Sequence, residues 1–201
     1  MTTASDTDTT RAHLRGVLAD LAGVVDGVTD RQLDAPTPCV DDDVAHLLEH
    51  VMGWLTTFAE GFVDPGGRAP RSGLDGYRPP PATGDAVRSA TELLDAALVR
   101  GAAARPLVLG EAAMPGAMAL SMILAEYQIH GWDLAVATGQ PWAPVEDGLE
   151  ESLAFLPAML TEDYQGEGKP FGPRVEVDTD ASPLARLLAL SGRDPGWTPP
   201  R

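Results

Sequence analysis

Apolar residues recur at intervals of three and four in four long stretches of the chain, which is the spacing of one face of a helix. These stretches cover about 7–28, 44–62, 85–100 and 117–138. Alternating apolar and polar residues, the mark of a half-buried strand, are scarce between them. The sequence therefore predicts an all-α fold built on a four-helix bundle.

The connections between the predicted helices differ in length. Segment 64–85 is rich in glycine and proline, has no periodicity, and is longer than a usual bundle connection, so we expect a long crossover loop. The stretch "RPLVLGEAAMPG" interrupts the chain again before the fourth helix. Two further helices, at about 145–160 and after Ser182, should pad the outside. We expect a single domain, 1–201, with the bundle at about 7–140 and a C-terminal helical extension at about 141–201.

Charge and cysteine content exclude several classes of function. A formal net charge of −16 opposes binding to nucleic acid and to anionic membrane surfaces. Cys39 is the only cysteine, which rules out an internal disulfide and a zinc site of several thiolates. The sequence has neither a signal-peptide pattern nor eighteen uninterrupted apolar residues. We therefore expect a soluble cytoplasmic protein, and a homodimer is the oligomeric state that we consider.

The fourth predicted helix carries two polar side chains on its apolar side. Glu126 and His130 are four residues apart, so they project from the same face. Burying a carboxylate and an imidazole there is costly unless they are paired, hydrogen-bonded or bound to a metal. Facing helices of a bundle supply metal ligands in this way. The alternative is an ordinary pair on the surface of the helix.

The second predicted helix offers the third ligand. His50 lies beside its apolar stripe, and His46 lies one turn earlier on the same side, next to the acidic helix start. We favour His50, with His46 as a solvated side chain. Two imidazoles and one carboxylate would leave a coordination position open, as in catalytic sites. Zinc suits this set best, and iron, nickel and manganese also accept it.

Other side chains are secondary candidates. Asp133, as a catalytic-site residue, could hydrogen-bond His130 and fix its tautomer, or it could pair at the surface. Trp54 could wall a cofactor pocket or simply pack in the bundle, as could Trp132. Arg78, within a cluster of arginines and a tyrosine in the long loop, could bind an anionic cofactor or be solvated. We expect Cys39 to be structural.

Two motifs carry a resemblance to a known family. The segments "TPCVDDDVAHLLEHVMGW" and "EYQIHGWDLAVATGQP" resemble the two motifs of the DinB-like family, in the branch that includes the mycothiol-dependent maleylpyruvate isomerases. The closing segment from Phe171 to Trp197 resembles the tail of actinobacterial members. The resemblance implies a DinB-type bundle in which His50, Glu126 and His130 hold a divalent metal, usually zinc.

The resemblance also implies a reaction class. In that class a metal binds the sulfur of a low-molecular-weight thiol such as mycothiol and holds it as a thiolate for transfer to, or isomerisation of, a small electrophile. The full isomerase has a further C-terminal domain, for which segment 141–201 is too short. The alternatives are a metal-binding or ligand-binding protein without turnover, and a metal-dependent hydrolase with Asp133 as the base.

Overall fold

The computed structural model describes residues 4–39, 42–70, 81–169 and 171–200, and within these ranges the fold is mainly helical, as predicted. Two 3-10 turns, Asp30–Gln32 and Ala102–Ala104, lie in the connections. None of the described helices combines the length and the apolar character that crossing a membrane requires. The α-helices are α1 (Ala4–Gly27), α2 (Val44–Val63), α3 (Gly84–Val99), α4 (Gly116–Thr138), α5 (Glu146–Met159) and α6 (Pro183–Leu190).

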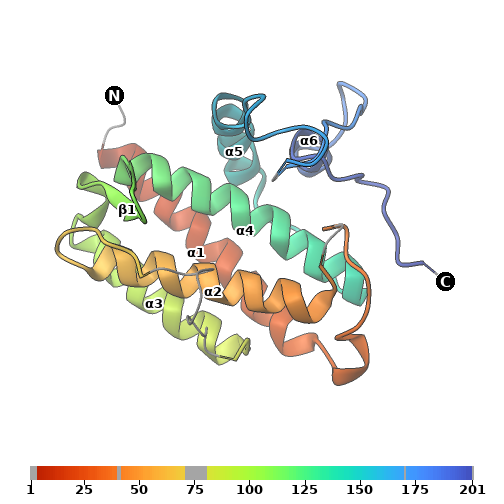
Figure 1. Ribbon diagram of the computed structural model, residues 1–201, viewed down its shortest axis with the longest axis horizontal. Coiled ribbons are helices and arrows are strands. Elements are labelled where there is room, and N and C mark those ends of the chain that lie inside the picture. The colour runs from red at the N-terminus through yellow and green to blue at the C-terminus, as the bar shows by residue number, and fades with distance from the viewer. Residues whose placement is uncertain (1–3, 40–41, 71–80, 170, 201) are drawn as a thin grey trace.

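Helices α1 to α4 form the bundle. Going round it, the order is α1, α3, α2, α4, so helices that are consecutive at the start and at the end of the bundle lie diagonally opposite each other. Helices α2 and α3 run in the same direction, and α1 and α4 run in the other (Figure 1). The connection between α2 and α3 must therefore return along the bundle, which accounts for the length of the predicted crossover.

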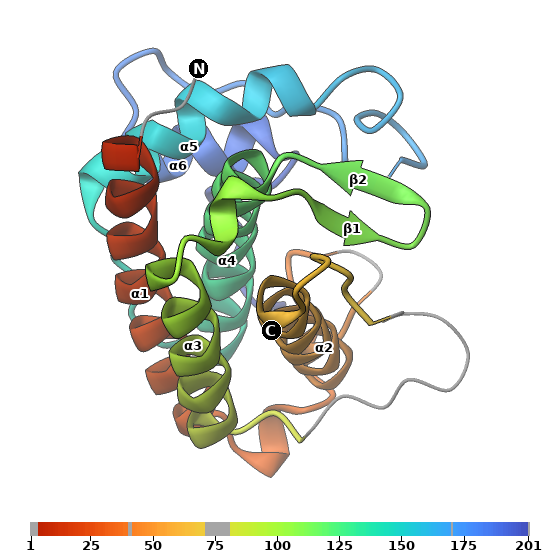
Figure 2. The same cartoon turned by 90° about the vertical axis from the view of Figure 1, so that its left-hand side faces the viewer.

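A small β-hairpin lies where the sequence predicts only an interruption of the helices. Strands β1 (Leu107–Leu109) and β2 (Ala112–Met114) pair in antiparallel register, and Arg68 forms a bridge to Val108. The turn uses Gly110 at a positive φ of 62°, which glycine adopts without steric cost. Strands of three residues are too short to show periodicity, so the sequence did not reveal them. The hairpin extends beside the end of α2 (Figure 2).

Helix α4 is buried on two sides. Leu120, Ile123 and Leu124 belong to the main bundle core, which α1, α2 and α3 complete. Ala125, Ile129 and Trp132 pack instead against α5 and α6, which cover the outer side of α4 (Figure 1). This double burial explains why the apolar residues of α4 lie all round the helix, whereas those of α2 and α3 lie mainly on one side. The helix ends at Thr138, and Gly139 follows as its C-cap with a φ of 71°.

A glycine on α4 allows the segment after the helix to pack closely. The indole of Trp142 lies over Gly131, and its Nε1–H donates a 3.0 Å hydrogen bond to the carbonyl oxygen of Gln128. A methyl group at residue 131 would overlap the indole ring. Because the ring is rigid and hydrogen-bonded, it has little freedom to move aside.

We predict that Gly131→Ala destabilises the protein by about 1–3 kcal/mol through this overlap, in spite of the better helix propensity of alanine. The matched control is Gly23→Ala on α1, where an added methyl group would meet no atom within 4 Å. That substitution should stabilise the protein by about 0.5–1 kcal/mol. Urea unfolding followed by circular dichroism measures both changes. Equal effects at the two positions would show that Trp142 does not restrict residue 131.

Candidate metal centre

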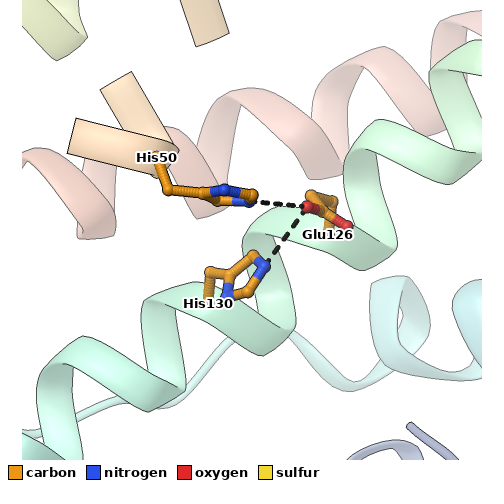
Figure 3. A group of neighbouring side chains, drawn as sticks. All are labelled: His50, Glu126 and His130. Carbon is orange, nitrogen blue, oxygen red and sulfur yellow. Dashed lines mark ion pairs between the residues drawn. The ribbon is translucent and has the colours of Figure 1, made fainter. Parts of the chain in front are cut away.

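Helices α2 and α4 bring His50, Glu126 and His130 together. One carboxylate oxygen, Oε1 of Glu126, lies 3.5 Å from Nε2 of His50 and 3.2 Å from Nε2 of His130. The three side chains converge from the two helices (Figure 3). The two imidazole rings meet edge to face, with centroids 5.0 Å apart. One potential ligand atom from each of the three residues lies within 4.8 Å of the other two, so a single ion could contact all three.

The register of α2 against α4 is fixed next to these ligands. The hydroxyl of Tyr127 donates a 3.1 Å hydrogen bond to the carbonyl oxygen of Val51, and both residues are buried. Each of them follows a ligand in the sequence, Tyr127 after Glu126 and Val51 after His50. A slip of either helix would break this bond, so the same contact that joins the helices also holds the ligands opposite each other.

The donor set fits a divalent metal in two respects. Nε2 of His50 is shielded from solvent and has no hydrogen-bond partner among the described residues, which is a costly state for a buried polar atom. A tetrahedral ion with bonds of about 2.1 Å would place its ligand atoms about 3.4 Å apart. The two distances to the carboxylate oxygen, 3.2 and 3.5 Å, lie on either side of this value.

Without a metal, His130 is protonated at neutral pH and lies between the carboxylates of Glu126 and Asp133. Burial works to raise the pKa of Glu126, but the charge and hydrogen bond of His130, together with His50, hold this pKa well below its usual range. Burial works to lower the pKa of His130, but the charges of Glu126 and Asp133 raise it to about 9. A metal ion would therefore take the place of a proton between groups that are already arranged around a positive charge.

Asp133 lies behind His130 and not at the surface. Its Oδ2 is 3.0 Å from Nδ1 of His130, so the ring can donate this proton and present Nε2 to a metal. The carboxylate is fully buried and is absent from the wall of the cavity. This geometry suits a side chain that orients His130, and it keeps the carboxylate out of reach of a ligand in the cavity.

Arg193 completes the group, and sequence reasoning missed it. Its Nη2 donates a 3.1 Å hydrogen bond to Oδ2 of Asp133, and its side chain is 9% exposed. The turn after α6 delivers it: the Arg193 N–H bonds to the Leu188 carbonyl, and Gly192 has a φ of 85°. A glycine after an apolar helix signals such a turn, but nothing in the sequence shows that the following arginine points inward.

A cavity of about 540 Å³ opens at the three ligands. Its walls come from α2, α4, α5, the hairpin and the C-terminal segment. Trp54 lines it, with its ring centroid 6.4 Å from that of His50, and also packs against the bundle core. Trp132 packs between α4 and the outer helices and does not line the cavity. A ligand here would therefore contact the metal ligands and an aromatic side chain of α2 together.

The remaining candidates fall in three places. His46 is exposed and bonds through Nδ1 to Oδ1 of Asp43, the N-cap of α2, so it lies outside the cluster of ligands. Arg78 lies outside the described residues. Cys39 lines the cavity, where its thiol donates a 3.4 Å hydrogen bond to Asp42, and burial raises its pKa to about 12.

The fold and the site together define a class: helical-bundle proteins with a candidate two-histidine, one-carboxylate metal centre between two facing helices. Residues 14–135 match the family described as the mycothiol maleylpyruvate isomerase N-terminal domain. The chain belongs to this family, which agrees with the resemblance of its two motifs. The matched region contains His50, Glu126, His130 and Asp133, and it ends before Arg193.

Two curated relatives extend the similarity over nearly the whole chain. They are the uncharacterized proteins Rv0738 and MT0763 of Mycobacterium tuberculosis, strains ATCC 25618 / H37Rv and CDC 1551 / Oshkosh. Each is 30% identical over 189 residues, which is 92% of this chain and 98% of the relative. No solved structure matches the chain significantly.

We predict that the purified protein carries one divalent ion per chain, and that His50→Ala and Glu126→Gln each abolish this binding because they remove a ligand. Asp133→Asn should weaken metal affinity about 10–100-fold, since His130 loses its orienting carboxylate. Elemental mass spectrometry of protein prepared without chelators measures the content. His46→Ala, one turn before His50, is the matched control and should keep the metal. Equal metal content in all four variants would contradict the site.

The high pKa of Cys39 predicts an unreactive thiol. At pH 8, iodoacetamide should label the folded protein about 100-fold or more slowly than the urea-unfolded chain, because only the thiolate reacts. Since the folded pKa is raised, the rate should climb about tenfold per pH unit from pH 8 to 10. Mass spectrometry of timed samples gives the rates. Similar rates for the folded and unfolded chains would show that the thiol is accessible and ionised.

Proposed function

We propose that this protein is a metal-dependent thiol transferase or isomerase. In it, His50, Glu126 and His130 hold a divalent metal, zinc in the first instance, and the open position receives a low-molecular-weight thiol such as mycothiol. A small electrophile then reacts with the sulfur in the adjoining cavity. The observation that carries the proposal is the convergence of the three side chains at the end of a cavity large enough for a second compound. A cytoplasmic location is part of the proposal.

The absence of a reactive cysteine in the chain supports a function that uses an external thiol. Cys39 is the only cysteine of the chain, and its thiol is held protonated by burial and by its hydrogen bond to Asp42. It is therefore a poor nucleophile near neutral pH. The bound metal would supply the missing activation, because coordination lowers the pKa of a thiol and holds it as the thiolate. An external thiol is the partner that this chemistry requires.

The protein's own residues orient and shield the reaction. Asp133 accepts the Nδ1 proton of His130 and so directs Nε2 towards the metal, while Arg193 balances the charge of Asp133. Glu126 supplies one negative charge to the ion. Apolar walls keep water away from the sulfur, which preserves the nucleophile for the electrophile.

There are two alternatives to this function. A hydrolase with Asp133 as the base is disfavoured, because Asp133 is fully buried and turned towards His130 and Arg193. A metal-binding or ligand-binding protein without turnover would share both the metal centre and the cavity, and it differs in catalysing no reaction. Thiol dependence of the reaction separates all three functions.

We predict that mycothiol added to the cobalt-substituted protein produces a new sulfur-to-cobalt absorption band, because the thiolate enters the open coordination position. S-methylated mycothiol, which cannot ionise, is the matched control and should leave the spectrum unchanged. His46→Ala protein should respond like the wild type. An unchanged spectrum with mycothiol would contradict thiol coordination, and hydrolysis of an ester without any thiol would favour the hydrolase.

A further inference from the structure

The walls of the cavity are mainly apolar beyond the metal ligands. They include aromatic and aliphatic side chains from α2, the hairpin, α4, α5 and the C-terminal segment. Transfer of apolar surface into such a site is favourable, while a charged group entering it loses its hydration. The substrate that fits best is therefore one that is mostly apolar and loses little hydration energy when it enters the cavity. Examples of the lining side chains are Phe58, Leu109, Met122, Ile129, Leu156 and Phe171.

The charged side chains at the cavity are carboxylates or are already paired. Arg193 is the only arginine or lysine among the described residues of the wall; its Nη2 is bonded to Asp133, and its Nε, which has no hydrogen-bond partner, is shielded from solvent. Asp42 and Glu126 add two carboxylates to the wall itself. With a divalent ion bound, three positive charges would face three carboxylates, and a thiolate in the open coordination position would then leave the site with a net negative charge. A carboxylate on the substrate would find no net attraction.

An aromatic surface lies next to the candidate metal position. Trp54 and Phe58 follow His50 at intervals of one turn along α2, and all three line the cavity. The rings of Trp54 and Phe58 stack at a centroid distance of 5.4 Å and an angle of 26°. A flat ring in the cavity could pack against this pair, which gains apolar contact and aromatic stacking together.

Three methionines complete the wall, from three different elements. Met114 comes from the hairpin, Met122 from α4, and Met159 from the end of α5. Methionine side chains are flexible and polarizable, so they adapt to apolar ligands of different outline. This lining favours a group of related compounds over one compound with fixed polar contacts.

We propose that the electrophile of this site is an uncharged, apolar compound with an aromatic ring, which packs on Trp54 and Phe58 with its reactive carbon towards the metal centre. The proposal rests on the thiol-transfer function. With an aryl chloride, the sulfur–carbon bond forms and the carbon–chlorine bond breaks. Chloride leaves with the bonding electron pair, and the thiol proton passes to solvent.

The first test compares two compounds that differ only in charge, methyl 4-chloro-3-nitrobenzoate and 4-chloro-3-nitrobenzoate. Each is titrated into the zinc-loaded protein without mycothiol, with thiocyanate filling the open coordination position, so that calorimetry measures binding in the cavity and not coordination of the carboxylate to zinc. We expect the ester to bind about tenfold or more tightly than the acid. Equal or tighter binding of the acid overturns the proposal, and so does the absence of binding by both compounds.

Variants place the binding in this cavity. Trp54→Ala should weaken ester binding about tenfold, because the aromatic surface is lost. Met159→Arg adds a cation to the wall and should narrow or reverse the preference for the ester. Leu93→Ala, at an exposed position on α3, is the matched control and should change neither affinity. Circular dichroism verifies the fold of each variant. Ester affinity that Trp54→Ala leaves unchanged overturns the assignment to this surface.

Adding the thiol separates this proposal from the proposed function. If the ester binds in the cavity but mycothiol yields no conjugate, thiol transfer fails and the preference for an uncharged apolar ligand stands. If conjugates form and the acid is the better substrate, thiol transfer stands and the substrate class is overturned. Preferential conjugation of the ester, with the binding order above, supports both.

Discussion

Helix α4 has little contact with bulk solvent because the bundle covers one side of it and α5 and α6 cover the other. Polar side chains on such a helix must find partners within the protein, since an unpaired buried charge is strongly unfavourable. Glu126, His130 and Asp133 meet this requirement jointly. They form a continuous row that begins at His50 on α2 and ends at Arg193 in the C-terminal segment, with neighbouring groups 3.0–3.5 Å apart.

The row alternates between groups that carry or accept positive charge and groups that carry negative charge. Each carboxylate lies between two nitrogen-bearing side chains, so neither Glu126 nor Asp133 depends on a single partner. A metal between His50, Glu126 and His130 would replace the proton on Nε2 of His130 without leaving the other end unbalanced, because Arg193 neutralises Asp133 in either case. The arrangement joins an exchangeable ligand position to a fixed counter-charge, Arg193, on the other side of Asp133.

The helices and the three candidate ligands could be predicted because helical spacing in the sequence determines which side chains share a face. Glu126 and His130 are an example, and their burial made a metal a reasonable hypothesis. Whether Asp133 would face His130 or solvent depended on α5 and α6, which cover α4 through contacts between segments distant in sequence. The inward direction of Arg193 was undetectable for the same reason. Strands β1 and β2 were missed because three residues show no period.

Arg193 lies outside the part of this chain that matches the family model. The matched region, residues 14–135, includes the candidate ligands and Asp133 but not the cation that balances Asp133. A fragment limited to that region would keep every ligand and yet expose α4 and leave Asp133 without its counter-ion. The matched region is therefore not the whole of the candidate metal centre: a segment outside that region, which touches no candidate ligand directly, supplies part of its electrostatic support.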